Sequence, residues 1–236
     1  MLGVSASGPT GRSPDPAGPS PAQPARSLSV SERDAWAVLT SVSGLGPVGF
    51  GALLRHYGRA ISILDAALRP GAIPELVAAG VNDERATFGG DVAKEIVNVA
   101  REPQRVLKRI EAAGVAVVTL DDDAYPNRLR SIEMPPHVLF VTGDVAGLNS
   151  AHAVAVVGTR RPTEGGRIIS ARIGAAIAKT GAAVISGLAV GIDGAAHAAV
   201  NAEGGRTVAV LGSGHGRLYH RSTWDLPGRS SSTVGR

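Results

Sequence analysis

Short apolar runs alternate with amphipathic stretches in the C-terminal half of the chain. The first run, residues 154–157, is rich in β-branched side chains and stops at Gly158, which predicts a buried strand followed by a tight turn. Thr163 then provides an N-cap for a helix over about residues 164–180, which ends at Gly181. Four apolar residues at helical spacing form the stripe that this helix is predicted to bury: Ile169, Ile173, Ala176 and Ile177.

The same alternation continues through two more strands. Residues 183–185 form a second apolar run that stops at Gly187, and a short loop then leads to Asp193, which we expect to cap a further helix. A third run, residues 207–211, ends at Gly212. Three strands and two helices joined in alternation by glycine-bearing loops predict an α/β fold with a Rossmann-like parallel sheet.

The N-terminal half has helical periodicity. Ser31 can cap a first helix, and a Gly-Leu-Gly-Pro turn at residues 44–47 leads into a second one. This resembles a helix-hairpin-helix module, whose turn amides hold a DNA phosphate, but an ordinary αα-hairpin fits as well because the turn contains no Lys or Arg. Further helices are predicted at residues 60–68, 73–79 and 91–113, the last broken at Pro103. We therefore expect a small all-helical, helix-hairpin-helix or SAM-like domain.

Composition divides the chain into four parts. Residues 1–28 are dense in Pro, Gly, Ser and Ala, so we expect a disordered tail. Residues 29–113 form the helical domain and residues 114–219 a partial Rossmann-like domain. Residues 220–236 form an atypical polar tail without apolar periodicity, which predicts a sheet that is incomplete at its C-terminal end, with an unpaired edge at its third parallel strand. Two more strands are expected early in the Rossmann-like domain, at residues 115–120 and, as an edge strand, at 138–141.

Candidate chemistry gathers where the parallel strands end. All three reach a glycine: Gly158, Gly187 and Gly212. Ligands of open parallel sheets bind at this edge, where helix N-termini point unpaired N–H groups outward. Arg160, Arg161 and Arg167 add forked donors that match phosphate oxygens. The net charge of +4 is too small to indicate nucleic acid by itself, so this local cluster is the useful signal, and it predicts a phosphate site.

Other kinds of site lack their usual residues. The G-x-G-x-x-G dinucleotide fingerprint and the G-x-x-x-x-G-K-[ST] loop are absent, and the chain contains no cysteine. The carboxylates at 121–123 fit a solvated turn better than a metal site. Asp193 and His197 lie four residues apart, but without a nucleophile placed by motif we interpret them as capping and packing residues. No apolar run is long enough to span a membrane, and we expect a cytoplasmic protein.

Several linked motifs resemble one family. The segments VAVVGTRRPTEGGR, VISGLAVGIDGAAH and GGRTVAVLGSG, preceded by LDDDAYPNRLRSIEMPPHVLFVTGD, are similar to the DNA-processing protein A family, DprA or Smf. The resemblance implies a non-catalytic protein without a cofactor that binds single-stranded DNA and assists loading of the RecA recombinase in natural transformation. It implies DNA contacts from Gly158, Thr159, Arg160, Ser186, Gly187, Leu188, Ala189 and Gly191, with Arg161, Arg167 and Gly212 as secondary candidates.

The resemblance ends near Gly214, whereas members of the family continue well beyond this point. We therefore expect a chain that is truncated or frameshifted after about residue 219, for which the homodimer of the full-length family is doubtful. Two alternatives stay open. One is a nucleotide-binding enzyme similar to the phosphoribohydrolases, whose Rossmann domain looks alike, and the other is a nonfunctional fragment.

Overall fold

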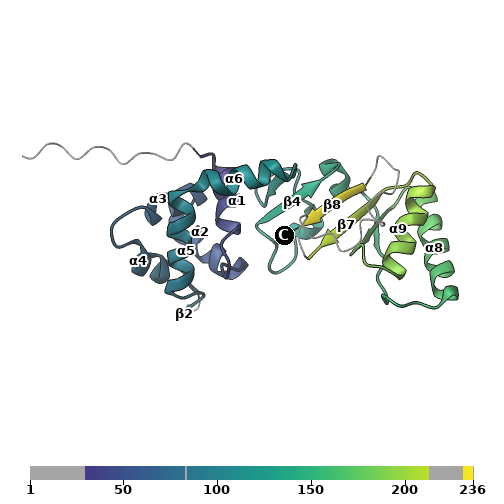
Figure 1. Cartoon of the computed structure of the whole chain (residues 1–236), viewed down its shortest axis with the longest axis horizontal. Helices are drawn as coiled ribbons and strands as arrows, with labels where there is room; N and C mark the ends of the chain where they lie inside the picture. The colour runs from purple at the N-terminus through teal and green to yellow at the C-terminus, as the bar shows by residue number, and fades with distance from the viewer. Residues whose placement is uncertain (1–29, 83, 213–230, 236) are drawn as a thin grey trace, which may run out of the picture.

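The computed structural model describes residues 30–82, 84–212 and 231–235. A helical part, coloured from purple to teal, lies beside a part built on a sheet (Figure 1). The tail expected at residues 1–28 lies outside the described residues. Within the described ranges, no helix is long and apolar enough to cross a membrane.

Six helices build the helical part, in the order that the sequence predicts. Ser31 and Asp34 close a capping box at the first of them: the Asp34 N–H donates to Ser31 Oγ at 3.1 Å, and the Ser31 N–H donates to Asp34 Oδ2 at 3.4 Å. Pro103 begins the sixth helix, where the break was predicted. The helices are α1 (Glu32–Thr40), α2 (Pro47–Tyr57), α3 (Ala60–Ala67), α4 (Ala72–Ala79), α5 (Gly90–Arg101) and α6 (Pro103–Ala112); a ribbon of β1 (Val81–Asn82) and β2 (Arg85–Ala86) follows α4.

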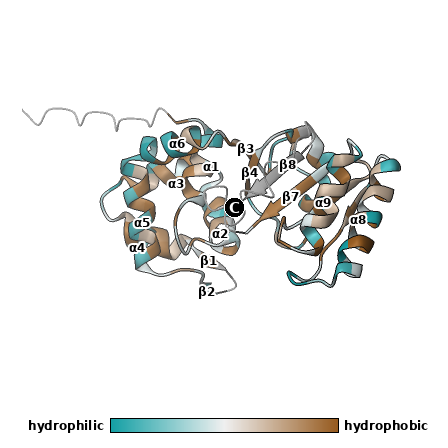
Figure 2. Ribbon diagram, turned by 45° about the vertical axis from the view of Figure 1, so that its right-hand side comes forward, coloured by the Kyte–Doolittle hydropathy of each residue, from teal (hydrophilic) through white to brown (hydrophobic). Residues whose placement is uncertain are grey.

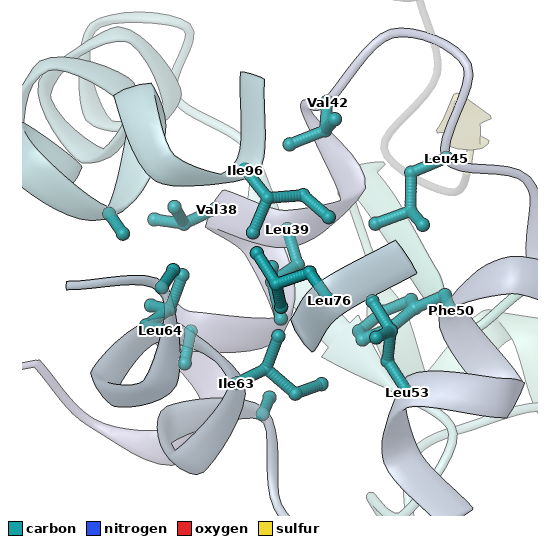
Figure 3. Packing of buried hydrophobic residues seen from close by; sticks show 14 of the residues in the cluster. Val38, Leu39, Val42, Leu45, Phe50, Leu53, Ile63, Leu64, Leu76 and Ile96 are labelled. Carbon is teal, nitrogen blue, oxygen red and sulfur yellow. The ribbon is translucent and has the colours of Figure 1, made fainter. Parts of the chain in front are cut away.

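The core of this part is formed by aliphatic side chains that the helices point at one another. Leu39 from α1, Leu53 from α2 and Ile63 from α3 are fully buried and converge with Leu76 and Ile96 from α4 and α5 (Figure 3). Burying an aliphatic side chain of this size contributes about 1.5–3 kcal/mol, so this cluster stabilises the helical part. The same core extends to Val138 in the strand that covers residues 138–142.

A six-stranded sheet forms the second part. Its strands are β3 (Ala116–Thr119), β4 (Val138–Thr142), β5 (Ala153–Ala155), β6 (Ala183–Ser186), β7 (Thr207–Leu211) and β8 (Ser231–Gly235), and their order in the sheet is β3-β4-β8-β7-β6-β5. The strands β5 to β8 are parallel, whereas β4 runs antiparallel to both β3 and β8. The predicted α/β fold with a parallel sheet is thus confirmed, with an antiparallel pair added beside it.

Two predictions about the edges of the sheet are wrong. The strand at 138–141 was expected at an edge, but β4 lies between β3 and β8. The third parallel strand was expected to lack a partner, but β7 pairs with β8 over the register Thr207 to Ser231 through Leu211 to Gly235. A polar segment such as Ser231–Gly235 can form an inner strand because its backbone groups pair with neighbours on both sides, whatever its hydropathy. The rest of the expected polar tail lies outside the described residues.

Helices α8 (Glu164–Lys179) and α9 (Ile192–Ala202) cover one face of the parallel strands (Figure 1). The predicted N-cap is confirmed, since Thr163 Oγ1 accepts from the Gly166 N–H at 3.1 Å. The predicted buried stripe is wrong for most of its members: Ile169 is 58% and Ile173 47% exposed, and Ala176 is exposed as well. The fourth member, Ile177, is partly buried and packs against the core beneath α8. The face of α8 that meets α9 carries Ser170 and Gly174 instead, because small residues let two helix backbones approach closely. Ile168, Ile169 and Ile173 therefore remain exposed on α8, and the ribbon of this helix includes hydrophobic positions (Figure 2).

A salt bridge and an aromatic cluster join the two parts. Arg33 Nη2 donates to Asp122 Oδ1 at 2.6 Å, and the Thr119 N–H donates to Asp122 Oδ2 at 2.7 Å. Burial alone would raise the pKa of the Asp122 carboxyl, but these hydrogen bonds outweigh it and hold the pKa below its usual value. His137 lies 5.8 Å from the Trp36 ring and 4.8 Å from the Phe50 ring, measured between centroids. Between these contacts and the sheet face opposite α9 opens a cavity of about 910 Å³.

Candidate nucleic-acid interface

The loops that follow β5 and β6 touch each other. The Ile192 N–H donates to the Thr159 carbonyl at 3.2 Å. Gly191 has φ +100°, and a β-carbon there would lie 2.3 Å from the Thr159 oxygen and 3.0 Å from the Arg160 Cα. The two predicted glycine loops therefore form one surface, and Arg160 lies where they meet.

The Asp193 side chain joins the same two loops through hydrogen bonds to their first residues. Its Oδ1 accepts from the Gly158 N–H at 3.1 Å, and its Oδ2 accepts from the Gly187 N–H at 3.1 Å. The residue is only 6% exposed. The expectation that Asp193 caps the helix is wrong, because the N-cap of α9 is Gly191, and the Asp193 side chain reaches across to the strand ends instead.

Backbone donors at the start of α9 are also paired. The Ile192 N–H donates to the Thr159 carbonyl at 3.2 Å, and the Gly194 N–H donates to the Ala189 carbonyl at 2.9 Å. The expectation of unpaired N–H groups pointing outward is therefore wrong for these two amides. Carbonyls of the two loops take the place of the partners that the first amides of a helix lack.

Three of the predicted contact residues shape the second loop. Ser186 is 4% exposed, and its hydroxyl donates to the Val156 carbonyl at 2.5 Å, which braces β6 against the chain leaving β5. Leu188 has φ +55°, a left-handed conformation that costs a residue with a side chain about 1–2 kcal/mol. Ala189 accepts the hydrogen bond from α9. The two hydrogen bonds connect the second loop to the chain after β5 and to α9.

The arginines around the loops are exposed to solvent. The Arg161 N–H donates to Thr159 Oγ1 at 3.1 Å, which turns the chain after Arg160. Within the described residues neither Arg160 nor Arg161 forms an ion pair, whereas Arg167 Nε lies 3.9 Å from Glu164 Oε2. The guanidinium groups of Arg160 and Arg161 can therefore bind an added anion without losing a carboxylate partner. The third predicted glycine, Gly212, follows β7 and borders the cavity on the other face of the sheet.

His197 on α9 is buried against β7, with 1% of its surface exposed. Its Nδ1 is hydrogen-bonded to Thr207 Oγ1, which itself donates to the Val184 carbonyl at 3.1 Å. Within the described residues Nε2 has no partner. Burial lowers the pKa of His197 to about 4, and the nearby Asp193 charge offsets this only in part. The ring is thus neutral at pH 7 and packs the core, as the sequence analysis preferred.

The carboxylates at 121–123 lie in a turn beside the helical part. Among the described residues no group of three or more acidic or histidine side chains is arranged to hold a metal ion. Asp122 is used for the contact with Arg33 described above, a role that the sequence did not indicate.

Comparison with known proteins gives the family. The family model described as DNA recombination-mediator protein A matches residues 116–232. The DNA processing protein DprA of Bacillus subtilis is 37% identical over 122 residues, which are 52% of this chain and 41% of that protein. The protein Smf of Synechocystis is 33% identical over 196 residues, which are 80% of this chain and 46% of that protein. Through this domain the chain belongs to the DprA/Smf family.

The fold agrees with this assignment. The crystal structure of DNA processing protein A (DprA) from Streptococcus pneumoniae superposes with a TM-score of 0.65 at 22% identity, over 87% of this chain and 67% of that one. The chain spans about half the length of the curated DprA and Smf relatives that it matches.

Sequence reasoning missed the part played by Asp193 in this DprA/Smf domain. The available signal was a single charged residue in the otherwise apolar run GLAVGIDGAA, which follows a strand. A carboxylate in such a run is buried only when it has hydrogen-bond partners, and the nearest donors in a parallel sheet are the amides of the adjacent strand ends.

Proposed function

We propose that this chain binds single-stranded DNA without catalysing a reaction, and that it assists the loading of RecA onto that DNA in natural transformation. The observation that carries the proposal is the position of Arg160. Its backbone lies at the junction of the two glycine loops, and its guanidinium is exposed and without an ion pair in the described part of the chain. A nucleic-acid backbone offers phosphates to such a group.

The surroundings of Arg160 favour a polymer over a small ligand. The guanidinium of Arg161 is a second exposed cation next to it, and Arg167 follows on α8. Exposed arginines at neighbouring positions suit successive phosphates of a strand, each held from outside. The likeness to DNA processing proteins supports DNA as the polymer.

The same residues argue against the enzymatic alternative. Asp193 and His197 are the acid–base pair that the sequence offers, and both side chains are buried and hydrogen-bonded inside the protein. Asp193 accepts from the Gly158 and Gly187 amides, and His197 is hydrogen-bonded to Thr207. Neither is placed to reach a substrate. We therefore favour binding over a phosphoribohydrolase-like activity.

Fluorescence anisotropy with labelled oligo-dT at several salt concentrations tests DNA binding. Each phosphate neutralised on a single strand contributes about −0.7 to the slope of log K against log salt. Arg160→Ala should weaken binding about tenfold, because a charge-assisted hydrogen bond contributes about 1.5 kcal/mol, and should make the slope shallower by about one contact.

Arg109→Ala is the matched control, since it removes the same charge from an exposed position on α6. It should leave both affinity and slope near those of the wild type. An Arg160→Ala variant with an unchanged slope would show that this surface is not the phosphate site. Release of a base from AMP by the wild-type chain would instead support the enzymatic alternative.

RecA assembly on the same oligonucleotide tests the second half of the proposal. The wild-type chain should shorten the lag before RecA filaments form, and Arg160→Ala should lose this effect in step with its DNA affinity. If the chain binds oligo-dT but leaves the lag unchanged, the proposed DNA site stands and the proposed action on RecA is refuted.

A further inference from the structure

Asp193 is a buried carboxylate, and its two oxygens accept hydrogen bonds from residues at the ends of two different strands. Oδ1 accepts from Gly158, just beyond β5, and Oδ2 from Gly187, just beyond β6, each at 3.1 Å. Within the described residues no cationic side chain forms an ion pair with it. The partners of this buried charge are therefore backbone amides, the same donors with which proteins bind anions.

Open parallel sheets hold a ligand phosphate with amides at this place. In this chain the amides of Gly158 and Gly187 already have a charged acceptor, and the amides of Ile192 and Gly194 in α9 donate to the carbonyls of Thr159 and Ala189 in the loops. A phosphate that entered at the strand ends would have to displace Asp193. The protein supplies its own anion at the position that a nucleotide occupies in related folds.

The carboxylate also sets the geometry of the loop that carries Arg160. Gly158 precedes Arg160 by two residues, and Gly187 begins the loop whose end, Gly191, lies against Thr159. A β-carbon at Gly158 would lie 2.7 Å from Ile192, so this loop has no space in which to shift toward α9. Asp193 thus ties together the two loops that meet at Arg160.

We propose that the Asp193 carboxylate is an internal anion that fills the phosphate position at the strand ends and, by tying Gly158 to Gly187, positions Arg160 to bind a phosphate outside them. Asp193 is a positioning residue, and its DNA effect rests on the function proposed above. A mononucleotide is excluded from the strand ends, whereas a strand that crosses over the loops is not.

Rescue by an added anion tests, without DNA, whether Asp193 acts as an internal anion. Asp193→Ala leaves two amides without an acceptor and a space the size of a carboxylate. Sodium formate should therefore raise the melting temperature of Asp193→Ala by about 2–4 °C more than that of the wild type, relative to sodium chloride of equal ionic strength. Asp193→Asn is the matched control, because its side chain fills the space and formate should give no extra gain.

Amide resonances report the contact directly. In the wild type, the Gly158 and Gly187 amide protons should resonate downfield, as expected for donors to a carboxylate. Asp193→Ala should move both upfield, and formate should move them back. Asp193→Asn retains one acceptor, so one of the two should stay downfield. If Asp193→Ala does not fold, the Gly158 and Gly187 amide resonances of Asp193→Asn are compared with those of the wild type. Two unchanged resonances would overturn the proposal.

A double-mutant cycle with oligo-dT tests the positioning. Asp193→Ala should weaken binding about tenfold in the wild-type background and have little effect when Arg160→Ala is present, since Asp193 acts through Arg160. Additive losses would overturn the positioning role, and absence of formate rescue would overturn the internal anion. A wild-type chain that does not bind oligo-dT at all would refute the proposed function. The formate effect on the melting temperature and the amide resonances of Gly158 and Gly187 would still test whether Asp193 is an internal anion.

Discussion

Gly191 lies so close to Thr159 that a β-carbon at position 191 would come within 2.3 Å of the Thr159 carbonyl oxygen. The contact connects the loops that follow two neighbouring parallel strands, and the hydrogen bond from Ile192 to the same carbonyl holds it at 3.2 Å. Only a residue without a side chain fits this approach, so the identity of residue 191 determines whether the two loops form one surface.

Gly191→Ala should therefore destabilise the fold by about 3 kcal/mol or more, because the new methyl group meets backbone at a φ of +100° that L-residues avoid. Urea unfolding followed by circular dichroism measures the loss. Gly181→Ala is the control: it also has positive φ, +77°, but no atom lies within 4 Å of its β-carbon, so it should cost only about 1 kcal/mol. Equal losses for the two variants would mean that the loop contact is not close.

Two glycines of α8 should respond in opposite directions to alanine. A β-carbon at Gly174 would lie 2.8 Å from the Ala196 carbonyl oxygen, so Gly174→Ala should force α8 and α9 apart and destabilise by about 1–3 kcal/mol. At Gly165 the nearest atom, Thr163 Oγ1, is 4.0 Å away, so Gly165→Ala should stabilise by about 0.5 kcal/mol through helix propensity. Thermal unfolding of both variants checks this, and a stabilised Gly174→Ala would contradict the close packing of the helices.

The salt bridge between Arg33 and Asp122 should depend on pH. The folded-state pKa of Asp122 is lowered, so its contribution is present above the unfolded pKa of about 3.9 and is lost as the pH falls through the lower folded value. Asp122→Asn should cost about 1 kcal/mol at pH 7, since Arg33 is 58% exposed, and this difference should shrink as the pH falls from about 3.9 through the lower folded pKa. Asp123→Asn, at the exposed neighbouring carboxylate, is the control and should change little. A pH-independent difference would show that charge is not the cause.

His197 should give the protein an acid-sensitive core. Its folded pKa of about 4 lies below the usual 6.5, so the neutral ring stabilises the fold fully above pH 6.5, and this stability is lost as the pH falls toward 4 because the unfolded chain takes up the proton first. The loss should approach about 3 kcal/mol. His197→Asn keeps a donor for Thr207 and removes the titration, so its free energy of unfolding should be flatter over this range. His152→Asn, at an exposed position, should retain the wild-type slope.

Local patterns along the sequence determined most of the elements. Ser31, Pro47, Pro103 and Thr163 act within one turn of their own positions, so the helices that they begin could be placed from the sequence. The glycine after each parallel strand likewise placed the two loops and Arg160, because parallel strands bring their ends to one edge of the sheet.

Only the tertiary structure decided which side chains pack together and which distant groups form hydrogen bonds. Ile169 and Ile173 have the right spacing for a buried stripe, yet α9 packs on the small residues beside them, because the depth of approach depends on both helices at once. Strand β8 is polar and is placed by backbone pairing with β4 and β7. Asp193 pairs with Gly158 across 35 residues, and no local pattern encodes a hydrogen bond between groups that meet only when the sheet has formed.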